Sequence, residues 1–233
     1  FSFFLESLNR IYNSDLNSLA NWTSTSFISK QIKEDYPVGL ARLNNQLLAF
    51  GEKTVEAFYN AGNATGSILS PIKHLFKEIG LIGSPSNGGT HYYCTIEDRI
   101  YFVGRQSGGL SSVGVFTYNG STHEKISSSF VDEILGEQSA LIYSINAVGF
   151  NGQKAVAISL TAPSAATQRW LMFLPDWKDW FEWNSTVFTP VNASEFFLGV
   201  SPNQHKVYKF AATDNWRDDG TNFTMQTQFK LPQ

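Results

Sequence analysis

Short apolar runs separated by turns that contain Asn or Gly recur along most of the chain. In LARLNNQLLAF, residues 40–50, two such runs flank Asn44-Asn45. In AVGFNGQKAVAISL, residues 147–160, they flank Asn151-Gly152, a dipeptide that favours the type I′ turn of a two-residue hairpin. Tyr118-Asn119-Gly120-Ser121 repeats the same signal. The pattern predicts antiparallel strands joined by tight turns.

The strand, turn, strand units recur at a regular distance. Their first apolar runs lie near Phe3, Ala41, Tyr93, Ala147 and Phe197, and the spacing of roughly 40–55 residues is typical of propeller blades. We therefore predict an all-β fold, a β-propeller of five blades, with six blades as the alternative. Pairing of the N-terminal FSFFL strand with C-terminal strands near residues 223–231 would close the ring and remove exposed sheet edges. A β-sandwich is the other architecture that suits short strands with frequent turns.

Two segments depart from the strand pattern. In Pro71–Ile79, apolar residues lie at helical spacing and Gly80 follows as a C-cap, so a short amphipathic helix is expected. In ISSSFVDEILGEQ, residues 126–138, Ser128 or Ser129 can cap a helix that Gly136 would end. Both are expected to be helices between blades.

Composition narrows the classes of protein. The 233 residues are 42% hydrophobic and 15% aromatic, which excludes a disordered chain and fits one domain over residues 1–233. A net charge of -3 without a Lys/Arg run argues against strong direct binding of nucleic acid. The apolar runs are too short for a membrane helix, and the single cysteine, Cys94, lies in an apolar strand where burial makes a thiol inert.

The sequence contains no recognisable catalytic motif. His74, His91, His123 and His205 have no partners at metal-ligand spacing, and neither a Gly-x-Ser-x-Gly nor a phosphate-binding loop is present. The loop Asp214–Gly220 resembles a calcium-binding loop or the Asp-box turn of sialidases. However, Arg217 stands where a calcium loop needs an oxygen ligand, and Trp216 stands where the Asp-box has Ser or Thr. A tight turn exposed to solvent is therefore favoured. We expect no enzyme activity, and no catalytic, cofactor or metal-binding residues.

A tryptophan cluster is the strongest candidate for binding. RWLMFLPDWKDWFEW, residues 169–183, contains four of the six Trp. Exposed Trp side chains on a β-scaffold often bind carbohydrate or protein, which makes Trp177, Trp180 and Trp183 a candidate interaction surface. The alternative is that these rings pack between neighbouring blades.

The order of these segments resembles a known family. VGLARLNNQLLAFGEKTVEAFY, residues 38–59, and the later ISSSFVDEIL, residues 126–135, are similar to the central β-propeller region of packaged-DNA stabilisation proteins of short-tailed bacteriophages. The resemblance runs from about Asn13 to Gly199 and includes the hairpin at 147–160 and the Trp-rich segment. Proteins of this family are described as head-to-tail connector proteins or as tail accessory proteins similar to a tail nozzle.

This resemblance implies a virion structural protein, assembled in the host cytoplasm, that helps to close the connector and retain packaged DNA. Its expected partners are other tail or connector proteins and, in the full-length protein, further copies in a homo-oligomeric ring. Because FSFFLESLNR lacks an initiating Met, the chain is expected to be a segment of a longer protein. The alternative function is a sialidase-like glycoside hydrolase or a carbohydrate-binding propeller.

Overall fold

The computed structural model describes most of the first 185 residues and short stretches after them. The described ranges are residues 1–30, 32–82, 92–106, 113–138, 144–150, 153–160, 168–185, 189–193, 196–201, 206–210, 217–218 and 221–222. Residues 137–138, 150, 168 and those from 183 onward are described by their backbone alone. The chain divides into two compact units, Phe1–Ile126 and Ser127–Gln233.

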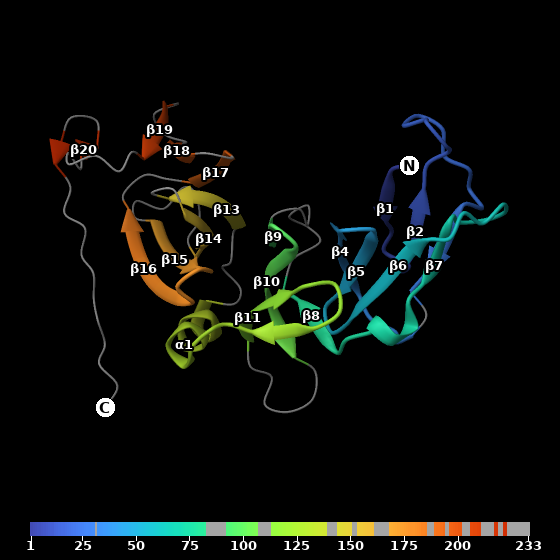
Figure 1. Cartoon of the computed structure of the whole chain (residues 1–233), viewed down its shortest axis with the longest axis horizontal. Coiled ribbons are helices and arrows are strands. Elements are labelled where there is room, and N and C mark those ends of the chain that lie inside the picture. The colour runs from blue at the N-terminus through green and yellow to red at the C-terminus, as the bar shows by residue number, and fades with distance from the viewer. Residues whose placement is uncertain are drawn as a thin grey trace. The chain divides into compact units, whose positions relative to one another are not determined.

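Three antiparallel sheets make up the first unit (Figure 1). The first sheet has the order β1-β2-β3, with bounds Phe3–Leu5, Arg10–Asn13 and Phe27–Ser29. The second has the order β4-β5-β6-β7, with bounds Pro37–Leu43, Gln46–Gly51, Val55–Asn60 and Leu69–Pro71. The third has the order β12-β11-β10-β8 with β9 also on β10, and its strands β8 to β12 are Ile79–Leu81, Tyr93–Ile96, Arg99–Gln106, Val113–Tyr118 and His123–Lys125.

The second unit contains the helix and the remaining strands. Helix α1 spans Ser129–Gln138. A sheet of order β13-β14-β15-β16 follows, with bounds Ser144–Phe150, Gln153–Ser159, Gln168–Leu174 and Asp179–Ser185. Next come the sheet β17-β18-β19, with bounds Thr189–Ala193, Phe196–Ser201 and Lys206–Phe210, and the pair β20-β21 at Arg217–Asp218 and Thr221–Asn222.

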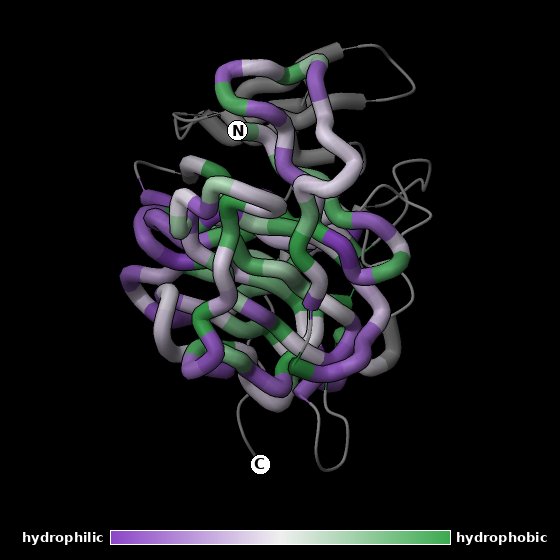
Figure 2. The backbone as a smooth tube through the Cα atoms, turned by 90° about the vertical axis from the view of Figure 1, so that its right-hand side faces the viewer, coloured by the Kyte–Doolittle hydropathy of each residue, from purple (hydrophilic) through white to green (hydrophobic). Residues whose placement is uncertain are grey.

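The second sheet is buried on both faces. Leu48 and Phe50 of β5 belong to a core shared with Ile100 and Phe102 of the third sheet. Ala49, between them on β5, belongs to a core that it shares with the first sheet. Successive residues of a strand point to opposite faces, so a strand covered on both sides is apolar at every position. In Figure 2, hydrophobic stretches coloured green alternate along the backbone with hydrophilic stretches coloured purple.

The hairpin predictions are confirmed in outline. Asn44-Asn45 form the turn between β4 and β5, and Asn44 adopts a left-handed φ of 53°. Phe150 pairs with Gln153, which leaves Asn151-Gly152 as the two loop residues, although those two lie outside the described residues. The third turn differs from the prediction. Its loop has four residues, 119–122, because the Asn119 side-chain oxygen accepts hydrogen bonds from the N–H groups of Ser121 and Thr122.

The predicted helix over Pro71–Ile79 is wrong. This segment holds the end of β7, one 3-10 turn at Lys73–Leu75 and the start of β8. Neighbouring strands take its backbone hydrogen bonds: Ile72 N–H donates to Ala57 O, and Lys77 pairs with Val55. Ladder partners on β6 therefore outcompete the local helical pattern.

Gly80 is also reassigned by the structure, since it lies inside β8 and is not a helix C-cap. It pairs with Arg105, and a Cβ there would collide with the backbone of Glu52. The second predicted helix is confirmed as α1, and Ser128 caps it through a side-chain oxygen that accepts the Val131 N–H at 3.4 Å. Gly136 lies within α1 and does not end it, because the helix continues to Gln138.

The all-β prediction holds for the described residues, which form six sheets and a single α-helix. Five or six propeller blades and a single domain over residues 1–233 stay predictions. The predicted closing strands near residues 223–231 lie outside the described residues. Within the described part of the chain, no helix is long and apolar enough to cross a membrane.

Candidate functional site

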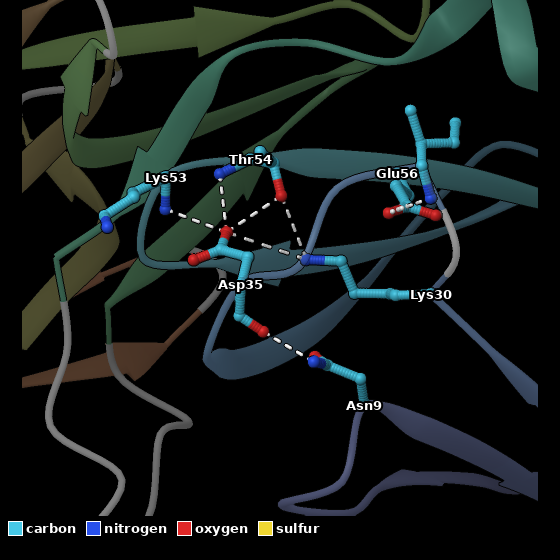
Figure 3. A network of polar contacts seen from close by, with 7 residues as sticks. Asn9, Lys30, Asp35, Lys53, Thr54 and Glu56 are labelled. Atoms are coloured by element: carbon cyan, nitrogen blue, oxygen red, sulfur yellow. Dashed lines mark hydrogen bonds and ion pairs between the residues drawn. The ribbon is translucent and has the colours of Figure 1, made fainter.

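A buried polar network joins segment 30–36, which leads from β3 to β4, to the turn between β5 and β6 (Figure 3). The turn is tight: the Gly51 N–H donates to the Thr54 carbonyl at 2.8 Å. Two exposed residues, Glu52 and Lys53, form its tip. The hairpin thereby presents backbone N–H groups to segment 30–36.

Asp35 is the centre of this network. Its Oδ2 accepts hydrogen bonds from the backbone N–H groups of Lys53 and Thr54, at 2.9 and 2.8 Å, and from the Thr54 hydroxyl at 2.8 Å. Asn9 Nδ2 donates to the backbone carbonyl of Asp35 at 2.6 Å. The Asp35 side chain is 1% exposed. Burial of a carboxylate is tolerated only when donors replace the lost water, and these three donors to Oδ2 do so.

Lys30 supplies the opposite charge. Its Nζ lies 3.8 Å from Asp35 Oδ2 and donates to Thr54 Oγ1 at 3.1 Å, and its side chain is 0% exposed. Burial lowers the pKa of the Lys30 ammonium, and the carboxylates of Asp35 and Glu56 offset this effect only in part. The charged form of Lys30 therefore depends on its acidic neighbours.

Two further residues complete the site. Glu56 on β6 is also buried, and its Oε1 accepts the Ile32 N–H at 3.3 Å, which ties segment 30–36 to the second sheet at another point. Gly51 leaves the space that the ion pair occupies, because a Cβ there would collide with the Asp35 carboxylate and the Lys30 ammonium.

The network links two sheets. A nucleophilic or proton-transferring Lys must reach a substrate, whereas neither charged side chain of the Lys30–Asp35 pair reaches solvent. Lys30 N–H also donates to Asn9 O, in the turn between β1 and β2. The cluster thus ties the first sheet, segment 30–36 and the second sheet together.

Sequence reasoning missed this network. KQIKEDYP, residues 30–37, has the composition of a solvated charged loop. The contact partners Thr54 and Glu56 are 19 to 24 residues away along the chain, and no motif ties them to the loop. Buried charge pairs of this kind follow from tertiary packing and have no local signal.

The predicted Trp surface divides into different environments. Trp177 lies in the turn between β15 and β16 and is 67% exposed. Trp180 on β16 is half-buried, and its ring lies 4.9 Å from that of Phe173. Trp183 pairs with Trp170 in the ladder, and its side chain lies outside the described residues. The shared interaction surface of Trp177, Trp180 and Trp183 stays a prediction, with Trp177 as its exposed member.

The remaining tryptophan of the cluster belongs to the core. Trp170 is fully buried, in a cluster with Ala155, Ala157 and Met172 of the same sheet. Packed and exposed tryptophans therefore both occur within residues 169–183. From the sequence alone, an exposed surface and a packed core were alternatives for the whole cluster.

The other candidate residues from the sequence, Cys94 and the histidines, lie in different environments. Cys94 is buried as expected, and burial raises the pKa of its thiol. His74 is exposed, while burial and the nearby Lys77 lower the pKa of the half-buried His123. His91 and His205 lie outside the described residues. In the ranges that the structure covers, no three His, Cys, Asp or Glu side chains gather as metal ligands.

The carboxylate-rich loop is described only at its end. Arg217 pairs with Asn222 and Asp218 pairs with Thr221, so Asp219-Gly220 connect two short antiparallel strands. The expected tight turn itself stays a prediction. Residues 214–216 and 219–220 lie outside the described residues.

Comparison with known proteins identifies one family. A family model described as "Bacteriophage P22 Gp10, beta-propeller" matches residues 3–166. No curated protein matches the sequence. The matched range contains the first unit from residue 3 onward, helix α1 and the β13–β14 hairpin.

Proposed function

This chain belongs to the Bacteriophage P22 Gp10 β-propeller family, and from that premise we propose that it helps to close the head-to-tail connector of a phage particle and to retain the packaged DNA. At the coarser level it is a phage structural protein. The observation that carries the proposal is the family match, which covers most of the chain.

The physical properties of the chain suit a wall around DNA. A net charge of -3 offers no release of counterions on contact with phosphate. A surface without excess positive charge does not hold the genome and lets it pass. Retention of the DNA then depends on closure of the assembled ring. In this proposal the full-length protein forms a homo-oligomeric ring, with other tail or connector proteins as its partners in the virion. This chain itself binds nucleic acid only weakly.

A rigid scaffold supports this role. The second sheet packs against the third on one face and against the first on the other, so the first unit has an apolar core on each side of that sheet. Cores on both faces of one sheet make a stable scaffold, which suits a structural role. The described polar network is consistent with this structural role.

Deleting the gene that encodes this chain tests the proposal. Particles produced without the protein are expected to package DNA and then lose it, so that empty heads dominate in a density gradient and the DNA per capsid falls. The intact gene supplied in trans restores full heads. Full, stable heads in its absence would refute the retention role.

The alternative, a sialidase-like glycoside hydrolase or carbohydrate-binding propeller, gains no support from the family match. Fluorogenic sialosides and other glycosides should give only background turnover with the purified chain. Turnover that falls on substitution of a single Arg or Glu would favour the enzyme.

A further inference from the structure

The buried Lys30–Asp35 pair holds an amine and a carboxyl group together in a space closed to solvent. Lys30 Nζ lies 3.8 Å from Asp35 Oδ2, and both side chains are buried. Removal of a lysine amine from water is one way in which proteins make it a nucleophile. Because the buried amine does not reach an external substrate, the acyl group in contact with it is that of Asp35.

The Thr54 hydroxyl lies between the two charged groups (Figure 3). Its oxygen accepts a hydrogen bond from Lys30 Nζ at 3.1 Å, and its proton is donated to Asp35 Oδ2 at 2.8 Å. A hydroxyl that accepts from one group and donates to the next can pass a proton in that direction. Thr54 can therefore carry protons from the ammonium to one oxygen of the carboxylate.

Backbone donors act on the same carboxylate oxygen. The N–H groups of Lys53 and Thr54 donate to Asp35 Oδ2 at 2.9 and 2.8 Å. Donors fixed in advance stabilise negative charge that develops on an oxygen during a reaction. The hydrogen bond from Gly51 N–H to Thr54 O holds the turn that carries both donors. Oδ2 is therefore the oxygen that this site prepares to leave.

We propose that Lys30 and Asp35 condense to form an intramolecular amide, with Thr54 as the proton relay. Proton transfer through Thr54 first gives a neutral amine and a carboxylic acid. The nitrogen lone pair then attacks Asp35 Cγ and forms the C–N bond, while the carbonyl electron pair moves onto Oδ1. As the C=Oδ1 bond re-forms, the Cγ–Oδ2 bond breaks, a second proton passes from nitrogen to Oδ2, and Oδ2 leaves as water.

The condensation needs no other reactant. The ammonium begins with three hydrogens, of which the amide nitrogen keeps one and the departing water takes two. Burial favours the product, because charges taken out of water cost free energy that their mutual attraction offsets only in part, and a neutral amide removes both charges. The two groups are already in contact, so the step requires no encounter between separate molecules.

Burial also acts on the nucleophile and on the finished bond. It lowers the pKa of the Lys30 ammonium, although the carboxylates of Asp35 and Glu56 act in the opposite direction. The neutral amine is therefore reached more easily in the fold than in water. Once the amide has formed, the exclusion of water protects it from hydrolysis.

The amide staples the segment between β3 and β4 at a point where it is already anchored. Lys30 N–H donates to the Asn9 carbonyl, and Asn9 Nδ2 donates to the Asp35 carbonyl at 2.6 Å. The cross-link thus adds a covalent bond to a contact between this segment and the first sheet. It is a property of the first unit and does not depend on the proposed role in phage particles.

Mass spectrometry of the purified, denatured 233-residue chain tests this inference. The wild type should weigh less than its sequence by the mass of one water molecule, whereas Lys30→Arg and Asp35→Ala should have their full masses. Glu34→Ala is the matched control, because it removes a neighbouring carboxylate that is exposed, and it should lose water as the wild type does.

Digestion with trypsin shows where the water is lost. Trypsin does not cut after a Lys whose amine is amidated, so the cross-link predicts a branched peptide that joins residues 11–33 to residues 34–42. A succinimide at Asp35 also loses water but leaves the chain open to cleavage after Lys30. The branched peptide therefore identifies the amide.

Two variants of Thr54 test the relay. Thr54→Val removes the hydroxyl at nearly constant shape and should slow the loss of water, whereas Thr54→Ser keeps the hydroxyl and should preserve it; circular dichroism establishes that both are folded. Equal rates for Thr54→Val and the wild type would overturn the relay. A folded wild type that keeps its full mass after prolonged incubation, or that is cut after Lys30, would overturn the cross-link.

Discussion

Asp35→Ala should strongly destabilise the first unit. The substitution removes the acceptor of three hydrogen bonds, two of them from backbone N–H groups, and the counter-ion of a Lys30 side chain that is 0% exposed. Removing one partner of a buried ion pair costs about 3–5 kcal/mol, because the remaining charge is left buried. For a protein of this size, each kcal/mol shifts the melting temperature by about 2–4 °C, so a decrease on the order of 10 °C is expected.

Thermal unfolding followed by circular dichroism measures this effect at neutral pH. Glu34→Ala is the matched control, since it removes the neighbouring carboxylate, which is exposed, and should change stability by less than about 0.5 kcal/mol. Lys30→Met/Asp35→Ala should be more stable than Asp35→Ala alone, because the double variant leaves no buried ammonium. Equal melting temperatures for Asp35→Ala and Glu34→Ala would refute the reasoning.

The pH dependence of Asp35→Ala gives an independent check. Burial already lowers the pKa of Lys30 below its ordinary 10.5, and loss of the Asp35 charge lowers it further. Between the lowered pKa and 10.5 the unfolded chain binds more protons than the folded one, so stability rises with pH in that window. The difference in the free energy of unfolding between wild type and Asp35→Ala should therefore become smaller as the pH is raised toward 10.5.

Three further predictions concern packing, titration and binding. Gly80→Ala should lower the free energy of unfolding by about 1–3 kcal/mol, because its Cβ would overpack against the Glu52 backbone. Gly136→Ala, in open space on α1, should raise the free energy of unfolding by about 0.5–1 kcal/mol. Urea unfolding of both variants measures these changes. Burial raises the pKa of Tyr118 to about 12. Between pH 10 and 12 the folded chain therefore binds more protons than the unfolded chain, and the free energy of unfolding falls as the pH rises. In melts over this pH range, Tyr118→Phe should lose less stability than the wild type. The purified chain should bind duplex DNA poorly, and a submicromolar affinity near physiological salt in a fluorescence titration would contradict the role of the net charge of -3.

Local signals were enough for many of the strands, several turns and the family. Apolar runs around Asn44-Asn45 and Asn151-Gly152 predict antiparallel hairpins because turn chemistry and alternation act over a few residues. The same local logic predicted helix α1 with Ser128 or Ser129 as its cap, and it predicted that Cys94 is buried. The order of these segments was sufficient to recognise the phage family that the comparison then identified.

Tertiary structure decided what depends on distant partners. Pro71–Ile79 has a helical pattern, yet β6 and β10 supply ladder partners that a local pattern cannot anticipate. Trp170 and Trp177 have the same side chain seven residues apart, and only their places in a core strand and a turn make one buried and the other exposed. Lys30 and Asp35 look like solvated charges in the sequence. They become a buried pair because Thr54, far along the chain, brings hydrogen-bond donors that replace water, and this compensation exists only once the two sheets have packed.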